Sequence, residues 1–408
     1  MIFSGKKYLF LQRDIYIIDS ESIFFYMKMW SYFFYVLLVL IISSCGSERH
    51  TSIPINLEHQ IIPGHEMLSN NTQFSTLLEE YRYIIPETNE ESLFAYIYKA
   101  YIYRDCIFIL DKKFQDKILV FDLNDGKFII GIGNQGGGPN EYTNLGNFTL
   151  DKNKGDILIL DEHRNSVIIY DAVTGIFKSS FNLNFTARNI EYVDENILAY
   201  AGGGQYMDRL YFTDFKGEVL DSYIASNEKN WVVPINSFSR GTGNEIVFRT
   251  YLTDSLYTLT PQGPVVSRFI DFGNDALTWE RFNSYSQNEK DNIEEYLHIY
   301  RANIKYYSET DSHIWFIFSD KNTPCCTVYN KETSDIFNYS MFITNDIIFD
   351  GFAPLISASD EGFFIGANDA LSIKENVEQL TSADVIPEGI KSMPDDNNPV
   401  ITLLKFKK

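Results

Sequence analysis

A repeat of about 50 residues is the feature of this sequence that most constrains its fold. Two pairs of short apolar segments, each ending in aspartate and followed by glycine, carry the repeat: residues 107–111 and 118–122, then residues 157–161 and 167–171. Corresponding aspartates lie 50 positions apart (161 − 111) and the following glycines 49 apart (175 − 126). Repeats of about 40 to 50 residues with about four short strands each are typical of β-propeller blades.

Further copies of the unit follow along the chain. The third, fourth and fifth copies are recognised at residues 197–214, 246–259 and 314–330. The strand-like segments that remain lie at the two ends of the repeat region, at residues 81–85, 347–349, 362–365 and 400–406. A ring leaves open sheet edges unless its ends share a blade, and open edges invite aggregation. The sequence therefore predicts an all-β fold, a six-bladed β-propeller over residues 80–408 whose sixth blade combines both ends.

One segment interrupts the pattern. Residues 274–323 contain no glycine or proline, and the apolar residues between Ile293 and Ile304 recur at helical spacing. A helical insertion is therefore predicted at residues 274–310, between the fourth and fifth blades. Its expected role is a bracket packed against the ring, with a lid or a partner-binding helix as the alternative.

The N-terminal region resembles a lipoprotein signal peptide. Lys28 precedes an apolar run over residues 30–42, which is too short for a membrane span of about 20 residues. The run leads into Ile42-Ser43-Ser44-Cys45, which resembles a lipobox. We therefore expect residues 1–44 to be removed, with residues 27–44 as the signal proper. Cys45 would carry the lipid that attaches the protein to the membrane, and residues 45–79 would form a tether.

Charge and cysteine content exclude several classes of protein. The formal net charge of −21 repels phosphate backbones, so no nucleic acid partner is expected. With Cys45 lipidated, three cysteines remain, Cys106, Cys325 and Cys326, and an odd number disfavours a disulfide framework. Buried free thiols are preferred over one bridge to Cys106. The six histidines show no metal-ligand spacing, and neither a metal nor a cofactor is expected.

The glycine-rich stretch over residues 131–142 has two interpretations. Gly131, Gly133 and Gly136 match the GxGxxG pattern of dinucleotide-binding loops. That pattern requires a helix that opens at the third glycine to hold the pyrophosphate, whereas here the chain continues through Pro139 into another strand. A structured turn between two blades is the preferred interpretation.

The same stretch carries a resemblance to a known family. The order Ile132-Gly133-Asn134-Gln135-Gly136-Gly137-Gly138-Pro139-Asn140-Glu141-Tyr142 resembles a turn of six-bladed β-propeller lipoproteins of the Gram-negative cell envelope, with NHL-like and TolB-like architecture. Residues 253–259 and 398–400 support it. The resemblance implies the propeller fold and a location in the cell envelope, at the outer membrane, but no settled activity.

A functional site is expected at one end of the ring, where connections between blades emerge together with those between second and third strands. The polar and aromatic residues expected there suit a glycan, a peptide or a partner membrane protein. The candidate ligand-binding residues are Gln135, Glu141, Tyr142, Arg164 and Arg249, and further candidates are His163, Tyr206, Asp208 and Asp254. No catalytic motif is visible, so a non-catalytic binding or assembly module is expected. The alternative is a propeller lyase or glycoside hydrolase with its active site in the central funnel.

Overall fold

The computed structural model describes residues 55–63, 73–202, 208–224, 236–241, 245–250, 254–321, 323–340, 346–347, 354–379 and 388–408. Contacts divide the chain into two units, Met1–Ser52 and Ile53–Lys408, and every described residue belongs to the second. The predicted signal segment and Cys45 lie outside the described residues. Among the helices in the described ranges, none is both long and apolar enough to cross a membrane.

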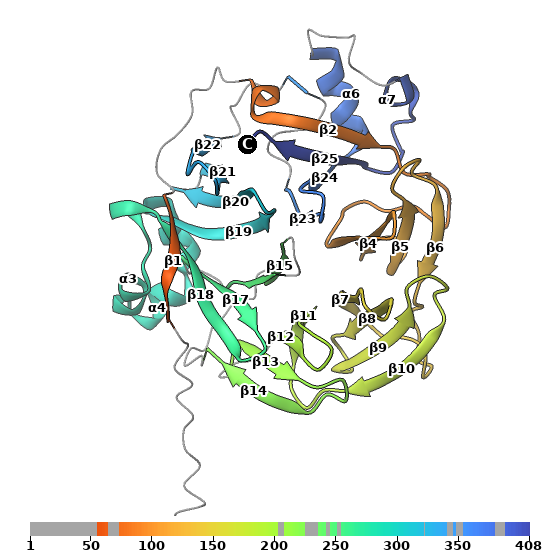
Figure 1. Ribbon diagram of the computed structural model, residues 1–408, viewed down its shortest axis with the longest axis horizontal. Coiled ribbons are helices and arrows are strands. Elements are labelled where there is room, and N and C mark those ends of the chain that lie inside the picture. The colour runs from red at the N-terminus through yellow and green to blue at the C-terminus, as the bar shows by residue number, and fades with distance from the viewer. Residues whose placement is uncertain are drawn as a thin grey trace, which may run out of the picture. The chain divides into compact units, whose positions relative to one another are not determined.

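The second unit is a six-bladed β-propeller, which confirms the predicted fold class (Figure 1). The first blade contains β3 (Ala100–Tyr103), β4 (Cys106–Asp111), β5 (Lys117–Asp122) and β6 (Phe128–Ile132). The second contains β7 (Leu145–Asp151), β8 (Asp156–Asp161), β9 (Ser166–Asp171) and β10 (Phe177–Asn182). The third contains β11 (Ala187–Tyr192), β12 (Leu198–Gly202), β13 (Leu210–Thr213) and β14 (Val219–Tyr223). In each of these sheets, chain neighbours pair antiparallel and the first strand lies nearest the centre of the ring.

The remaining blades follow the same plan with additions. The fourth contains β15 (Phe238–Arg240), β16 (Ile246–Phe248), β17 (Ser255–Thr260) and β18 (Gly263–Asp271). The fifth contains β19 (Arg301–Glu309), β20 (His313–Asp320), β21 (Thr323–Asn330) and β22 (Ile336–Ser340). The sixth contains β23 (Ser357–Ala358), β24 (Phe364–Asn368), β25 (Val400–Phe406) and β2 (Leu78–Ile84). Strand β2 pairs antiparallel with β25, with Tyr81 opposite Leu404, so both ends of the repeat region share this blade as predicted.

The apolar strands of each blade are buried on both faces. Along β4, Ile107 and Ile109 pack with residues of the sixth blade, whereas Phe108 and Leu110 pack with residues of the second. Successive side chains of a strand point to opposite faces, so a sheet between two others needs apolar residues at every position. This explains why the middle strands show unbroken apolar runs instead of alternation.

The segment before the ring is more ordered than expected. Strand β1 (Ile55–Pro63) pairs in parallel with β18 and forms a fifth strand on the outer edge of the fourth blade. A short 3-10 helix, η1 (Phe74–Leu77), then leads into β2. The tether expected over residues 45–79 therefore contains a strand and a 3-10 helix. The physical reason is that the outer edge of β18 offers unpaired backbone groups, which a passing extended segment satisfies.

The predicted insertion between the fourth and fifth blades is present but shorter than residues 274–310. It contains η3 (Gly273–Asp275), α3 (Trp279–Ser284), α4 (Gln287–Asp291), α5 (Ile293–Tyr296) and η4 (Leu297–Ile299). From Arg301 the chain is the innermost strand β19, whose apolar residues were mistaken for a continuing helix. Its helices pack on one another through an apolar cluster that includes Phe282, Ile293 and Leu297.

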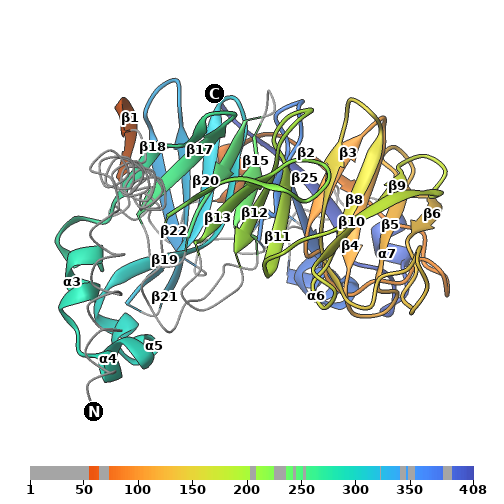
Figure 2. The ribbon, with the colours of Figure 1, turned by 90° about the horizontal axis from the view of Figure 1, so that it is seen from below.

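Two further helices, α6 (Ala370–Gln379) and α7 (Glu388–Ser392), were not predicted; they lie between β24 and β25. Figure 2 shows α6 and α7 at the same end of the ring as α3, α4 and α5. We call this the helical end. It is the end that the connections between blades and those between second and third strands share, because the strands within each blade alternate in direction.

The cysteines follow the preferred interpretation. Cys106, Cys325 and Cys326 form no disulfide with one another, and the last two are buried. Cys325 packs toward the fourth blade and Cys326 toward the sixth, since adjacent residues of β21 point to opposite faces.

Candidate functional site

The glycine-rich segment is a closed turn between β6 and β7 at the helical end. Gln135 and Tyr142 form a parallel β-bridge across it. Gly133 has φ of +88°, and a Cβ there would lie 2.6 Å from Cε1 of Tyr142, so only glycine fits. The chain then enters strand β7 instead of a helix. This confirms the interpretation as a structured turn and not as a dinucleotide-binding loop.

Four of the five candidate ligand-binding residues meet at this turn. Tyr142 is fully buried, and its hydroxyl donates a hydrogen bond to the backbone carbonyl of Asp116. Arg164 donates from Nη1 to the Glu141 carbonyl at 2.8 Å. The Glu141 carboxylate accepts from the Gly138 amide at 2.8 Å, and Gln135 Nε2 donates to the Thr143 carbonyl at 3.3 Å. These side chains hold the turn itself, and Tyr142 as described is not accessible to a ligand.

The remaining candidates are dispersed. Arg249 follows β16 and is buried with 2% exposure, away from the glycine-rich turn. His163 is exposed beside Arg164, and Asp208 is partly buried before β13. Asp254 accepts a hydrogen bond from the Ser255 hydroxyl, and Tyr206 lies outside the described residues.

The strand-ending aspartates act as turn caps. The carboxylate of Asp161 accepts hydrogen bonds from the backbone amides of Thr143, at 2.6 Å, and of His163, at 3.1 Å. That of Asp111 accepts from three successive amides, with Gln115 at 2.6 Å. Asp161 thereby ties the turn after β8 to the end of the glycine-rich turn.

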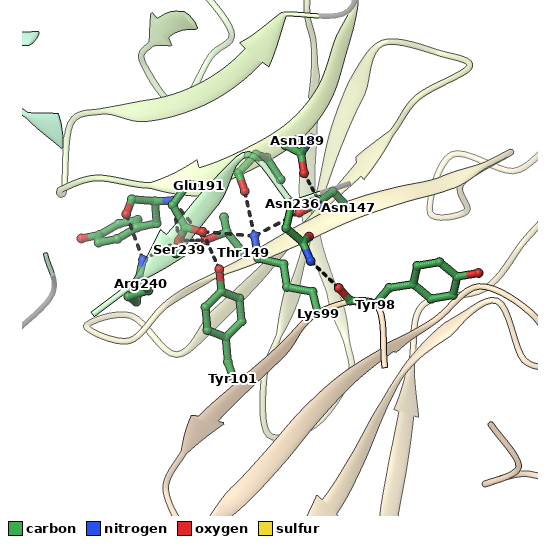
Figure 3. A network of polar contacts seen from close by, with 12 residues as sticks. Tyr98, Lys99, Tyr101, Asn147, Thr149, Asn189, Glu191, Asn236, Ser239 and Arg240 are labelled. Atoms are coloured by element: carbon green, nitrogen blue, oxygen red, sulfur yellow. Dashed lines mark hydrogen bonds and ion pairs between the residues drawn. The ribbon is translucent and has the colours of Figure 1, made fainter. Parts of the chain in front are cut away.

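A buried polar network that the sequence analysis missed joins the innermost strands (Figure 3). Glu191 on β11 is at its centre and is fully buried. Its carboxylate lies 3.1 Å from Lys99 Nζ and 2.8 Å from Arg240 Nη2. It also accepts hydrogen bonds from the hydroxyls of Thr149, at 2.7 Å, and Tyr101. Groups of the first, second and fourth blades therefore meet one carboxylate of the third blade.

The protonation states of this network follow from burial and charge. Burial alone would raise the pKa of Glu191, but the positive charges of Lys99 and Arg240 outweigh it and lower that pKa to about 2. Burial, together with the charge of Glu191, raises the pKa of the Tyr101 hydroxyl well above its ordinary value. At neutral pH Glu191 is therefore ionised and Tyr101 is a hydrogen-bond donor. The ion pairs and hydrogen bonds of Glu191 therefore link the innermost strands of neighbouring blades.

The network continues toward the helical end. Lys99 Nζ also donates to Asn147 Oδ1 at 3.0 Å, and Asn147 Nδ2 donates to Asn189 Oδ1 at 2.9 Å. Asn236 Nδ2 donates to the Tyr98 carbonyl at 2.6 Å, which links the fourth blade to the first. The sequence does carry one sign of this network. Polar residues occur on the first strand of a blade, although the second strand that follows it is wholly apolar.

Exposed aromatic and basic side chains adjoin this region at the helical end. Tyr96 precedes β3 and is 59% exposed, and Phe114 in the turn after β4 is 52% exposed. Lys113 Nζ lies 4.9 Å from the ring centroid of Tyr96 and 5.8 Å from that of Phe114. Lys112 Nζ lies 5.9 Å from the ring of Tyr98 and donates to the Gly146 carbonyl at 2.9 Å. We call Tyr96, Tyr98, Lys112, Lys113 and Phe114 the aromatic–basic patch.

No set of three histidine, cysteine, aspartate or glutamate side chains within the described ranges is arranged to hold a metal ion.

The fold and these two features define the class: a six-bladed β-propeller whose innermost strands are joined by buried charges and whose helical end exposes aromatic rings. The sequence profile of the family described as Domain of unknown function (DUF4934) matches residues 59–405. The chain therefore belongs to that family. No curated protein matches it.

Similarity to a solved structure supports the fold. A protein from Bacteroides fragilis NCTC 9343 that bears the name of an exported protein has 20% sequence identity and a TM-score of 0.73, with 86% of this chain and 100% of that chain covered. A member of the DUF4221 family from Bacteroides vulgatus ATCC 8482 has 11% identity and a TM-score of 0.49, with 81% of this chain and 98% of that chain covered.

Proposed function

We propose that this protein is a non-catalytic binding module of the bacterial cell envelope that takes a polysaccharide on its helical end. In this proposal a lipid on Cys45 attaches the protein to the outer membrane. The Ile42-Ser43-Ser44-Cys45 sequence supports lipidation of Cys45. The similarity to a Bacteroides protein named as exported supports a location in the cell envelope.

The observation that carries the binding function is the exposure of Tyr96 and Phe114 on either side of Lys113. Large aromatic side chains are costly to leave in water, and exposed ones mark interaction sites. A sugar ring presents an apolar C–H face that packs on an aromatic ring, while its hydroxyl groups need hydrogen-bond partners. The patch supplies both kinds of contact.

The charge of the patch indicates which polysaccharides fit best. Lys113 places an exposed positive charge beside both aromatic rings, whereas the charge of Lys112 is offset by Glu162, whose Oε1 lies 4.0 Å from Lys112 Nζ. The charge of Lys113 favours encounter with an anionic ligand over a cationic one. A polysaccharide that contains acidic sugars offers apolar faces to the rings and a negative charge to Lys113.

The test is a binding screen of the mature protein against neutral and acidic polysaccharides. Replacing Tyr96 and Phe114 together with alanine should weaken binding at least about tenfold, because a stacked aromatic contact contributes on the order of 0.5–1.5 kcal/mol beyond its buried area. The matched control replaces Val173 and Ile176, which are 59% and 66% exposed in the turn between β9 and β10, and should bind as the parent does.

Lys113→Gln separates charge from stacking, and should weaken binding of acidic polysaccharides more than that of neutral ones. Products are analysed in the same reactions. The proposal fails if no polysaccharide binds, if the aromatic double variant binds like the control, or if any polysaccharide is cleaved. Capture of a membrane protein that depends on Tyr96 and Phe114, without polysaccharide binding, would assign the patch to protein assembly instead.

A further inference from the structure

The exposed large apolar side chains fall into two groups. The described residues include nine of them, and four of these lie in connections or helices of the helical end: Tyr96, Phe114, Ile299 and Leu371. The other five are all aliphatic and are 40 to 66% exposed. They lie in, or within two residues of, the turns that join third to fourth strands in the first three blades: Ile129, Val173, Ile176, Val219 and Leu220.

These turns belong to the end of the ring opposite the helical end, because the strands within each blade alternate in direction. We call this the turn end, and the five side chains the aliphatic band. Each turn packs on the outermost strand of the preceding blade. A Cβ on Gly175 would lie 3.0 Å from Cδ1 of Ile130 on β6, and a Cβ on Gly217 would lie 2.2 Å from the carbonyl oxygen of Asn182 on β10. The aliphatic band therefore extends over three neighbouring blades.

The chain enters the propeller at the same end. Ile55, the first residue of β1, lies opposite Val266 near the start of β18, which follows a turn between third and fourth strands. Figure 2 shows β1 on the side of the ring away from the helices. At Gly263 a Cβ would lie 2.9 Å from the Tyr223 ring, so this turn packs on β14, the strand that carries Val219 and Leu220. The point of entry on the fourth blade thus adjoins the aliphatic band on the third.

The length of chain before Ile55 limits how far the ring can lie from a membrane. Cys45 precedes Ile55 by ten positions (55 − 45), and a chain of that length spans at most about 35 Å. With the proposed lipid on Cys45, the turn end therefore stays within that distance of the membrane. This step rests on the proposed function, which supplies the lipid anchor.

The chemistry of the turn end suits the apolar boundary of a lipid surface. Exposed aliphatic groups gain from leaving water, and apolar side chains of membrane-bound proteins sit at the boundary of headgroups and acyl chains. Basic residues beside the aliphatic band are paired, as Lys127 is with Asp125 at 2.7 Å and Lys178 with Asp171 at 2.9 Å. Contact therefore requires no anionic lipid, which a net charge of −21 would repel.

We propose that the aliphatic band rests on the lipid surface of the membrane that holds the anchor. The helical end, with the aromatic–basic patch, then points away from that membrane and toward ligands in the surrounding medium.

The experiment places a fluorescent probe on single cysteines of the lipidated protein in phosphatidylcholine–phosphatidylethanolamine vesicles that contain acyl-brominated lipid as a quencher. Flotation of the vesicles in a density gradient first shows whether the protein is attached. Cys106→Ala removes the partly exposed native thiol, since Cys325 and Cys326 are buried.

Ile176→Cys and Leu220→Cys report on the aliphatic band, and Phe114→Cys reports on the helical end. Quenching at the two band positions should be at least about twice that at Phe114→Cys, because apolar groups at a membrane surface lie about 5–10 Å deep in the boundary of headgroups and acyl chains.

A charged variant tests whether the apolar side chains make the contact. Val173→Asp combined with Ile176→Asp should reduce quenching at Leu220→Cys at least about twofold, because an ionised carboxylate is costly to move out of water. Leu371→Asp, on α6 at the helical end, is the matched control and should leave that quenching unchanged.

Three results would overturn the proposal. Protein that floats with the vesicles but is quenched equally at both ends would refute the orientation and leave the lipid anchor standing. Protein that does not float would remove the anchor and this proposal with it. Probe emission at Ile176→Cys and Leu220→Cys that depends on protein concentration without vesicles would instead assign the aliphatic band to contact between copies of this chain.

Discussion

Replacement of Glu191 by glutamine tests whether the buried network fastens the blades. The change keeps the shape of the side chain but removes the only carboxylate within reach of Lys99 and Arg240 among the described residues. Breaking a buried ion pair by removing one partner costs about 3–5 kcal/mol, because the remaining charge stays buried without compensation. Glu191→Gln should therefore lower the free energy of unfolding at neutral pH by that amount.

The pKa of Glu191 gives an independent magnitude and a pH dependence. The pKa falls from 4.5 to about 2 on folding, which corresponds to a stabilisation of about 3 kcal/mol. The folded pKa is depressed, so this stabilisation is fully present above about pH 4.5 and is lost as the pH falls toward 2. At about pH 3 only about 1 kcal/mol remains.

The assay is urea-induced unfolding of parent and variant at about pH 6 and about pH 3, followed by tryptophan fluorescence. The difference in free energy of unfolding should shrink from about 3 to about 1 kcal/mol between the two pH values, because the parent loses what the variant already lacks. Other carboxylates titrate in both proteins and cancel in the difference. Glu195→Gln, at an exposed position after the same strand, should match the parent at both pH values. A Glu191→Gln protein as stable as the parent at pH 6, or a difference independent of pH, would refute the reasoning.

Two further predictions concern the turn and the anchor. Gly133→Ala should lower the midpoint of thermal unfolding by at least about 2 °C, since φ of +88° is strained for alanine and its Cβ would meet Tyr142, whereas Gly137→Ala, with no atom within 4 Å of its Cβ, should unfold like the parent. Equal midpoints for the two variants would contradict the packing described for Tyr142. Cys45→Ala should move the protein out of the membrane fraction of cells or leave an uncleaved precursor, while Cys106→Ala stays membrane-bound. Normal membrane retention of Cys45→Ala would exclude the lipid.

The propeller fold was predictable because the apolar run of each strand is a local sequence pattern that repeats along the chain. Strands such as β4 and β8 are buried on both faces, so each one is an apolar run that the period of about 50 residues identifies. Helix α6 lacked such a signal, because its sequence is largely polar between Ala370 and Gln379. Strand β1 was missed because a single edge strand has no repeat to mark it.

The candidate site was less predictable because its contacts join distant parts of the chain. Lys99 and Glu191 are separated by 92 positions, and nothing in the sequence near either residue indicates the other. Gln135, Glu141, Tyr142 and Arg164 lie together at the glycine-rich turn, but Tyr142 and Arg164 bond within it. Polar loop residues often satisfy the backbone of their own turn, and the sequence does not separate that role from ligand binding.

The pairing of β1 with β18 has a mechanical consequence if the chain is held at its N-terminal side. A pulling force transmitted along the chain reaches β1 at Ile55 before it reaches β2 at Leu78. The first hydrogen bonds under tension are therefore those between β1 and β18 on the fourth blade, and β1 can detach without breaking any strand pair of the closed ring. Detachment of β1 would therefore take up the extension first, and the pairing of β2 with β25 that closes the ring would stay intact.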